Sequence, residues 1–146
     1  MRLALFQPDN PRNVGGAIRL CACLGVPLDI VRPTGFPLDS RDVRRSALDY
    51  GASAEIVLHD GWSAFQRDPG GRLVLLTTGG AESLYGFTFH PGDVLLVGRE
   101  SAGVPPEVHD RAGARVYVPM APGARALNVV VAAAMALSEA RRQLGH

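Results

Sequence analysis

The sequence predicts an α/β fold with a mainly parallel sheet, built as one domain. Short apolar runs alternate along the whole chain with stretches of helical pattern, which is typical of βα repeats. Two of these runs, residues 73–77 and 94–97, are apolar almost without interruption, as expected for central strands buried on both faces. No linker or internal repeat divides the 146 residues, about the length of one domain. We therefore expect a single domain over residues 1–146.

The individual elements follow from the apolar runs, the turn residues and the helix-end signals. A strand is expected at 2–6, closed by the Gln-Pro-Asp-Asn-Pro segment of residues 7–11. The helix that follows, 13–24, is expected to have Asn13 as its N-cap and Gly25 just beyond its end. Further strands are expected at 28–31, 55–58, 73–77, 94–97 and 116–118, and further helices at 39–48, 61–67, 105–112 and 127–144.

The last helix carries almost no polar side chain over two turns, from Val129 to Leu137. A helix that is apolar all round is expected to be buried on all sides. A chain of this size has difficulty covering such a helix alone, so we infer that part of it lies in a subunit interface.

Composition argues against several classes of protein. The stretch 129–137 is the longest strongly apolar one and is far too short to cross a membrane. No secretory signal pattern is visible at the start, so we expect a cytoplasmic protein. Cys21 and Cys23 point to opposite sides of a helix, about 200° apart, and are expected to be buried reduced thiols. The histidines lack ligand spacing, so no metal site is expected.

The charge pattern permits two interpretations. The net charge of +1 gives no indication of nucleic-acid binding, yet all 15 basic residues are arginines, whose planar guanidinium suits phosphate contacts. A bias in the coding composition would give the same excess of arginine. Arg41, Arg44 and Arg45 form a local basic patch, which is either a solvated helix face or a phosphate-binding surface.

Three segments are candidates for a functional site, and the first is residues 13–19. Its adjacent glycines, Gly15 and Gly16, cost about 1 kcal/mol each in a helix relative to alanine, so the close approach of a ligand or a backbone is a reason for them. The chain has no lysine for a Walker A loop, and the glycines lack the spacing of a dinucleotide-binding fingerprint. The alternative is a plain loop-to-helix junction with a solvent-facing arginine.

The other two segments follow expected strands. Residues 98–103 come directly after strand 94–97, where ligands of open parallel sheets bind, although an ordinary strand-to-helix turn would look similar. Residues 116–128 lead through an irregular loop to Asn128, at the mouth of the apolar last helix. An unpaired amide there would be costly, so Asn128 has either a helix-capping or a site role.

Together the three segments resemble the motifs of the SpoU-type 2′-O-methyltransferases, within the trefoil-knotted SPOUT superfamily. The matching positions of the three motifs, in chain order, are Asn13, Gly16 and Arg19; Gly98, Glu100 and Gly103; and Val118-Pro119-Met120 with Leu127-Asn128. The resemblance covers essentially the whole chain.

The resemblance implies a knotted α/β homodimer whose C-terminal segment is threaded through a loop. It also implies S-adenosylmethionine as the cofactor, S-adenosylhomocysteine as a product, and transfer of a methyl group to a ribose 2′-hydroxyl of RNA. The short single-domain form is most similar to members that act on the wobble cytidine or uridine of tRNA, so the anticodon stem-loop is the expected partner. Methylation of ribosomal RNA, or RNA binding without catalysis, are the open alternatives.

The resemblance further implies the site residues. The expected cofactor-binding positions, many of them acting through the backbone, are Leu76, Thr77, Gly98, Glu100, Gly103, Val118, Met120, Ala126 and Leu127. The expected catalytic residues are Arg19, Asn13, Glu100 and Asn128, and the expected RNA contacts are Arg41, Arg44 and Arg45. Because a guanidinium is a poor base at neutral pH, we expect Arg19 to orient the hydroxyl and stabilise charge. Ala126 and Val130 depart from the family pattern, which often has serine at both positions.

Overall fold

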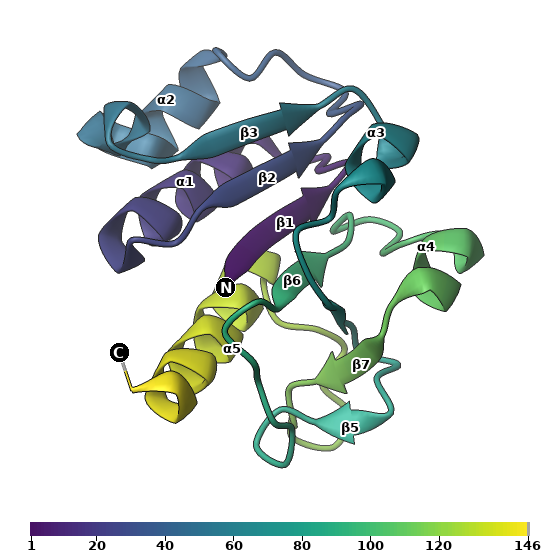
Figure 1. The fold of residues 1–146 in the computed structure, drawn as a ribbon. Helices are drawn as coiled ribbons and strands as arrows, with labels where there is room; N and C mark the ends of the chain where they lie inside the picture. Colours follow the sequence, from purple (N-terminus) through teal and green to yellow (C-terminus); the bar gives the residue numbers. More distant parts are fainter. Residues whose placement is uncertain (146) are drawn as a thin grey trace.

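The computed structural model describes residues 1–145. Seven strands form one sheet in which every pair of neighbours is parallel (Figure 1). The order across the sheet is β3-β2-β1-β6-β4-β7-β5. The strands are β1 (Arg2–Phe6), β2 (Leu28–Val31), β3 (Ile56–His59), β4 (Leu73–Leu76), β5 (Glu82–Ser83), β6 (Val94–Val97) and β7 (Ala114–Tyr117). The expected α/β class and parallel sheet are confirmed.

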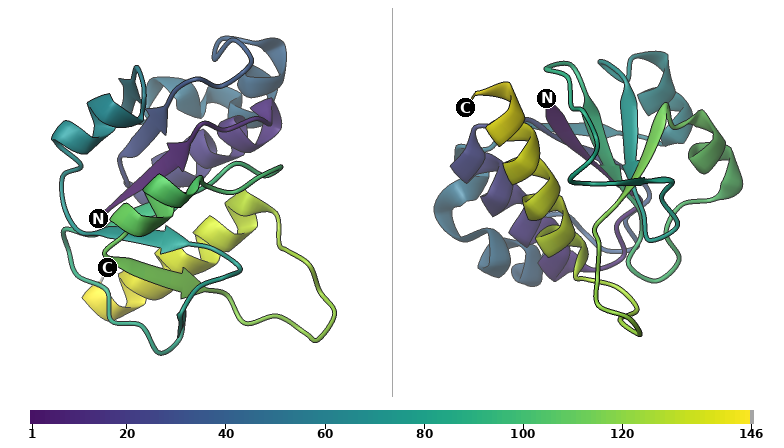
Figure 2. Two further views of the ribbon diagram at one scale, coloured as in Figure 1. Left: turned by 90° about the vertical axis from the view of Figure 1, so that its right-hand side faces the viewer. Right: turned by 90° about the horizontal axis from the view of Figure 1, so that it is seen from below.

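Helices cover both faces of the sheet (Figure 2). They are α1 (Pro11–Leu24), α2 (Arg41–Ala47), α3 (Trp62–Arg67), α4 (Pro106–Arg111) and α5 (Val129–Leu144), with a 3-10 helix, η1, at Leu48–Ala52. The larger apolar cluster joins α1, α2 and α5 to one face, and the smaller cluster joins α3 and α4 to the other. The sheet is therefore the middle of three layers.

The central strand β6 shows why its sequence is continuously apolar. Leu95 and Val97 point into the larger cluster, whereas Val94 and Leu96 point into the smaller one. Successive side chains of a strand point to opposite faces, so a strand covered on both faces needs apolar residues at every position.

Helix α1 begins earlier than expected. Its N-cap is Asn10, whose side chain accepts a hydrogen bond from the backbone N–H of Arg12, and Pro11 occupies the first turn. The prediction of Asn13 as N-cap is therefore wrong, and its amide is free for other partners. At the other end, Gly25 adopts the left-handed conformation (φ 63°), as expected for a residue that ends a helix.

The close approach expected at the paired glycines is present, and it is made by a backbone. A Cβ on Gly15 would lie 2.4 Å from the Ser46 side chain and 2.5 Å from a carbonyl oxygen of α2. Gly15 thus allows α1 and α2 to pack in direct contact. A Cβ on Gly16 would come no closer than 3.5 Å to Val130 of α5, which is an ordinary van der Waals distance.

Several expectations need correction. Helix α2 is shorter than residues 39–48, because the chain tightens into η1, and the two-residue strand β5 was not expected at all. Strand β7 begins at Ala114, two residues before its apolar run. Cys21 is buried as expected, and burial first, with the nearby charge of Asp29 second, raises its pKa to about 12. Cys23 is exposed, contrary to expectation.

Helix α5 is not buried on all sides within this chain. Its inner side, which includes Ala133, Ala136 and Leu137, is buried, whereas Val131 is 49% exposed. Leu127, just before the helix, is 39% exposed. No helix within residues 1–145 is long and apolar enough to cross a membrane.

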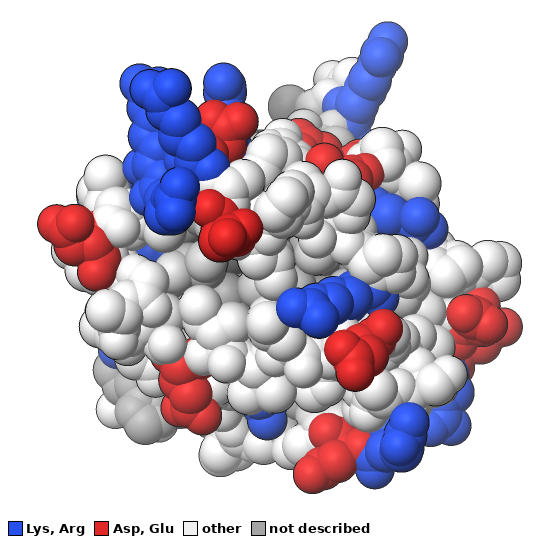
Figure 3. Space-filling model, turned by 90° about the horizontal axis from the view of Figure 1, so that it is seen from above, with Lys and Arg blue, Asp and Glu red and all other residues white. Residues whose placement is uncertain are grey.

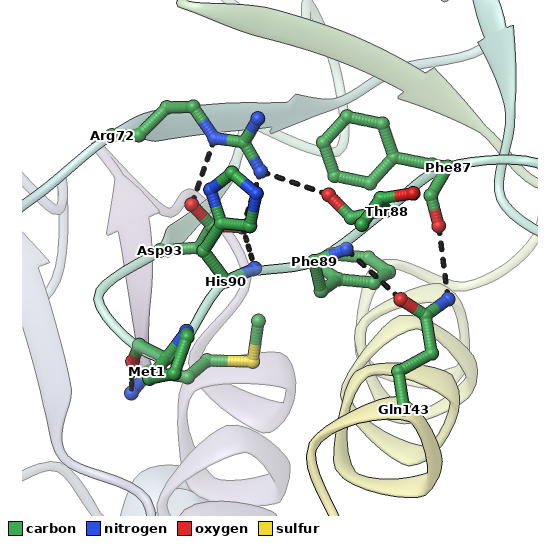
Figure 4. A network of polar contacts seen from close by, with 9 residues as sticks. Met1, Arg72, Phe87, Thr88, Phe89, His90, Asp93 and Gln143 are labelled. Carbon is green, nitrogen blue, oxygen red and sulfur yellow. Dashed lines mark hydrogen bonds and ion pairs between the residues drawn. The ribbon is translucent and has the colours of Figure 1, made fainter.

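The C-terminal half of α5 is fastened to the segment before β6 (Figure 4). Gln143 accepts a hydrogen bond from the backbone N–H of Phe89 and donates one to the carbonyl of Phe87, both at 2.9 Å. On the other side of this segment, the guanidinium of Arg72 forms two hydrogen bonds to the carboxylate of Asp93, at 2.8 and 2.7 Å. The segment is thus held between α5 and the start of β4.

Candidate active site

A cavity of about 410 Å³ opens at the carboxyl ends of β4 and β6, where the loop after β7 also passes. All nine positions expected to bind the cofactor line it: Leu76, Thr77, Gly98, Glu100, Gly103, Val118, Met120, Ala126 and Leu127. Asn128 lines it as well. The structure therefore brings the second and third motif segments together with the end of β4 around one space.

The turn after β6 owes its shape to two glycines. Arg99 and Gly103 exchange two backbone hydrogen bonds, of 3.0 and 2.8 Å, so the chain folds back on itself within five residues. A Cβ on Gly98 would lie 2.6 Å from the Gly103 carbonyl carbon, and Gly103 has a φ of 61°. Only glycine fits both positions without strain. The turn, residues 98–103, is called the motif-two turn below.

The loop after β4 is joined to β7. The backbone N–H of Thr77 donates to the carbonyl of Val116 at 2.9 Å, and its side-chain oxygen accepts from the N–H of Gly79 at 3.3 Å. This fixes one wall of the cavity through backbone contacts, independent of most side chains.

Three predicted catalytic residues form a hydrogen-bonded relay. The Asn128 amide donates to the Asn13 side-chain oxygen at 2.9 Å, and the Asn13 amide in turn donates to the Glu100 carboxylate. Asn13 is 9% exposed, so its amide is largely withdrawn from water. The relay connects residues that lie 115 and 87 positions apart in the chain.

Asn128 caps α5 and also bonds to the first motif segment. Its side-chain oxygen accepts from the backbone N–H groups of Val130 and Val131, at 2.9 and 3.3 Å, and so caps α5. Its amide nitrogen meanwhile donates to Asn13. The first turn of α5 is thereby tied to the first turn of α1.

The residues just before α1 also contact the motif-two turn, and sequence reasoning did not single them out. Asn10 donates to the Glu100 carboxylate at 3.0 Å, and Asp9 accepts from the backbone N–H groups of Glu100 and Ser101, at 3.2 and 3.3 Å. Burial tends to raise the pKa of Asp9, but hydrogen bonds from the Ser101 hydroxyl and backbone outweigh it and lower that pKa from 3.8. Pro11, which marks the true helix start, was the available signal for Asn10.

Arg99 is the one basic residue among the described residues that line the cavity. The central carbon of its guanidinium lies 5.8 Å from the centre of the Phe6 ring. The motif reasoning passed over this position because the second motif does not specify it.

The structure does not bring Arg19 to the cavity of its own chain. The side chain is exposed on α1, with its guanidinium carbon 5.9 Å from the centre of the Tyr50 ring. Tyr50 belongs to η1, which packs against α1 directly after α2. Arg19 therefore lies on the side of the molecule that carries α2.

The three arginines of α2 are exposed. Arg41, Arg44 and Arg45 form no salt bridge within residues 1–145. On the face seen in Figure 3, basic and acidic side chains are interspersed, and the largest basic group lies at one edge of it. Within the described part of the chain, no group of three or more acidic, histidine or cysteine side chains could hold a metal ion.

The parallel sheet, the cavity at its strand ends and the three converging segments define an α/β methylase of the SpoU class. The chain belongs to the SpoU rRNA Methylase family, whose model matches residues 1–138. Over 146 residues it is 52% identical to a tRNA (cytidine(34)-2'-O)-methyltransferase of Beijerinckia indica, covering 98% of this chain and 91% of that protein.

Solved structures agree with this assignment. A structure described as giving insights into the 2-OH methylation of C/U34 on tRNA superposes with a TM-score of 0.94 at 41% identity, covering 99% of this chain and 95% of the other. An AdoMet-bound rRNA methyltransferase from Sinorhizobium meliloti superposes with a TM-score of 0.87 at 30% identity, covering 98% and 56%.

Proposed function

We propose that this protein transfers the methyl group of S-adenosylmethionine to the ribose 2′-hydroxyl of nucleotide 34 of tRNA, a cytidine or uridine, in the cytoplasm. The observation that carries the proposal is that the second and third motif segments line one cavity at the carboxyl ends of parallel strands, while Asn13 of the first segment is hydrogen-bonded to both. Relatives that are 52% and 49% identical over nearly the whole chain support the choice of substrate.

The cavity suits the proposed cofactor. Its volume, 410 Å³, falls within the range of about 300–1,000 Å³ for small-ligand sites, and its lining combines apolar side chains with polar and charged groups. Bound S-adenosylmethionine supplies a methyl group on a sulfonium, ready for in-line displacement. We assign its binding to the nine lining positions named above. Ala126 is exposed and lacks a hydroxyl, so we assign its contribution to the backbone.

We assign Asn13, Glu100 and Asn128 to the support of the site, because their side chains bind one another. Arg19 is the residue that we assign to the reacting ribose. A guanidinium can orient the 2′-oxygen and stabilise charge, and alignment of reactants supplies a large share of the barrier reduction. Since Arg19 is exposed and does not line its own cavity, we propose that it serves the cavity of a second copy.

A homodimer with a knotted C-terminal segment is part of this proposal. The half-exposed Val131 and the exposed Leu127 beside it give an apolar surface at the start of α5 that a second copy can cover. Helix α5 returns from the end of β7 to pack against α1 and β6, which is compatible with a threaded segment. Both features follow the family pattern.

Arg41, Arg44 and Arg45 are our candidates for contacts with tRNA phosphates, since they are exposed, form no salt bridge within residues 1–145, and belong to a helix that packs against α1, which carries Arg19. Replacing all three with glutamine should reduce the salt dependence of tRNA binding. The slope of log affinity against log salt should fall by about 0.7–0.9 for each phosphate that an arginine no longer neutralises. An unchanged slope would contradict the assignment.

The test of the activity is incubation of the purified protein with total RNA and methyl-labelled cofactor, followed by mapping of the labelled ribose. We expect label at position 34 of tRNA. Label in ribosomal RNA alone would instead support methylation of ribosomal RNA. Binding of cofactor or RNA without methyl transfer would support a non-catalytic RNA-binding protein. Arg19→Ala should abolish transfer without loss of folding. Arg67→Ala, an exposed arginine of α3, is the matched control.

A further inference from the structure

Asp9 joins the segment between β1 and α1 to the motif-two turn by contacts that the three motifs do not include. Its Oδ1 accepts a hydrogen bond from the backbone N–H of Glu100 at 3.2 Å. Its Oδ2 accepts from the backbone N–H of Ser101 at 3.3 Å and also from the Ser101 hydroxyl. One carboxylate thus satisfies two consecutive backbone donors of an irregular turn.

These contacts determine where the rim of the cavity lies. The turn that Asp9 holds supplies Gly98, Glu100 and Gly103 to the cavity lining. Its other contacts outside the turn include those from Asn10 and Asn13, and both of these reach the Glu100 side chain rather than the backbone. The backbone of the turn therefore depends on Asp9 for its attachment to the segment between β1 and α1.

The exposure of Asp9 separates this local effect from overall stability. Its side chain lies at the surface, where a charged contact adds little to the free energy of folding because water competes for it. A local change in the turn can still alter a binding site that uses the turn's backbone. The expected consequence of losing Asp9 is thus a looser cavity in a folded protein.

We propose that Asp9 is a positioning residue of the active site, which acts through Ser101 and the motif-two turn to hold the cavity in the form that receives the cofactor. The proposal rests on the proposed function, because it assumes that the cavity binds S-adenosylmethionine. Asp9 itself does not contact the reacting atoms in this proposal.

The first test measures the affinity of purified Asp9→Asn for S-adenosylmethionine by calorimetry, together with KM, kcat and the melting temperature. The substitution keeps the size of the side chain but removes its charge and one acceptor. We expect affinity to fall on the order of tenfold, and KM for the cofactor to rise in proportion, with a smaller change in kcat. The melting temperature should stay at the wild-type value. Asp68→Asn, an exposed aspartate at the end of α3, is the matched control.

A second pair of variants tests the partner side of the contact. Ser101→Ala removes only the hydroxyl, whereas Ser101→Thr retains one. We expect weaker cofactor binding in Ser101→Ala and binding close to wild type in Ser101→Thr. The double variant Asp9→Asn with Ser101→Ala should bind the cofactor no more weakly than Asp9→Asn alone.

The outcomes distinguish this proposal from the proposed function. Cofactor binding by Asp9→Asn as tight as that of the wild type would overturn it, as would equal binding by Ser101→Ala and Ser101→Thr. A fall in affinity that is matched by a fall in melting temperature would show a merely structural role. Failure of the wild-type protein itself to bind S-adenosylmethionine would instead refute the proposed function.

Discussion

Asn13→Asp tests the relay at the centre of the candidate site with a change of one atom. The substituted side chain keeps an oxygen that can accept from Asn128, but the group that donates to Glu100 becomes a second carboxylate oxygen. At neutral pH two like charges would then face each other at hydrogen-bond distance. We expect the free energy of unfolding to fall.

The size of the effect follows from the contacts. The missing hydrogen bond to a charged acceptor is worth about 1.5–3 kcal/mol. Repulsion between two unit charges about 4 Å apart reaches about 4 kcal/mol at an effective dielectric constant of 20. Glu100 is exposed and can turn toward water, which removes most of that repulsion. We expect a net loss of about 2–4 kcal/mol, or about 5–10 °C in melting temperature for a chain of this length.

The pH dependence gives a sharper test than the magnitude. Two adjacent carboxylates raise the pKa of one of them in the folded variant, so the folded state binds a proton that the unfolded chain releases at about pH 4. Between the pKa of about 4 in the unfolded chain and the raised pKa in the folded variant, the free energy of unfolding of Asn13→Asp falls as pH rises. Denaturant titrations of variant and wild type should thus differ least near pH 4 and most at pH 8. An equal difference at both pH values would refute the reasoning.

The neighbouring substitution Asn10→Asp is the matched control. Asn10 also donates to Glu100, but this contact is exposed, and aspartate caps a helix as well as asparagine does. The loss in stability should be clearly smaller than for Asn13→Asp.

Three further predictions concern the frame around the site. Gly15→Ala should destabilise the protein by about 1–3 kcal/mol in denaturant titrations, because its Cβ would collide with the backbone of α2, whereas Gly16→Ala should be tolerated. Gln143→Ala should lower the melting temperature by about 3–8 °C, because two partly buried backbone groups before β6 lose their partner. Burial tends to raise the pKa of Asp93, but the hydrogen bonds from Arg72 outweigh it and lower that pKa. The pair therefore stabilises the fold above about pH 4, and this contribution is lost as pH falls through the lowered pKa. Asp93→Asn should remove this part of the acid sensitivity in denaturant titrations.

Local signals in the sequence predicted the parallel sheet and the position of the cavity. The short apolar run 94–97 is typical of a central strand buried on both faces, and the glycines after it mark a turn at the strand end. The start of α1 was misplaced because Asn10 and Asn13 are equally good caps by composition, although Pro11 favours the first. Strand β5 was missed because two residues carry no periodicity.

Contacts between distant segments lay beyond local signals. The hydrogen bonds that Asp9 accepts from Ser101 span 92 positions, and nothing in either segment indicates the other. Arg19 does not line the cavity of its own chain, and this too depends on how α1 is placed on the sheet, which a sequence pattern does not specify.

The start of α5 links the assembly of the site to the docking of the C-terminal helix. Asn128 caps α5 with its oxygen and binds Asn13 with its nitrogen, and Asn13 in turn binds Glu100 of the motif-two turn. The relay can therefore close only when α5, the last helix along the chain, lies against α1. If the cavity binds S-adenosylmethionine as proposed, the same closure completes the cofactor site, and ligand binding must stabilise the docked helix by mass action. This accounts for amide side chains at Asn13 and Asn128, since an amide can accept from one neighbour while it donates to the next.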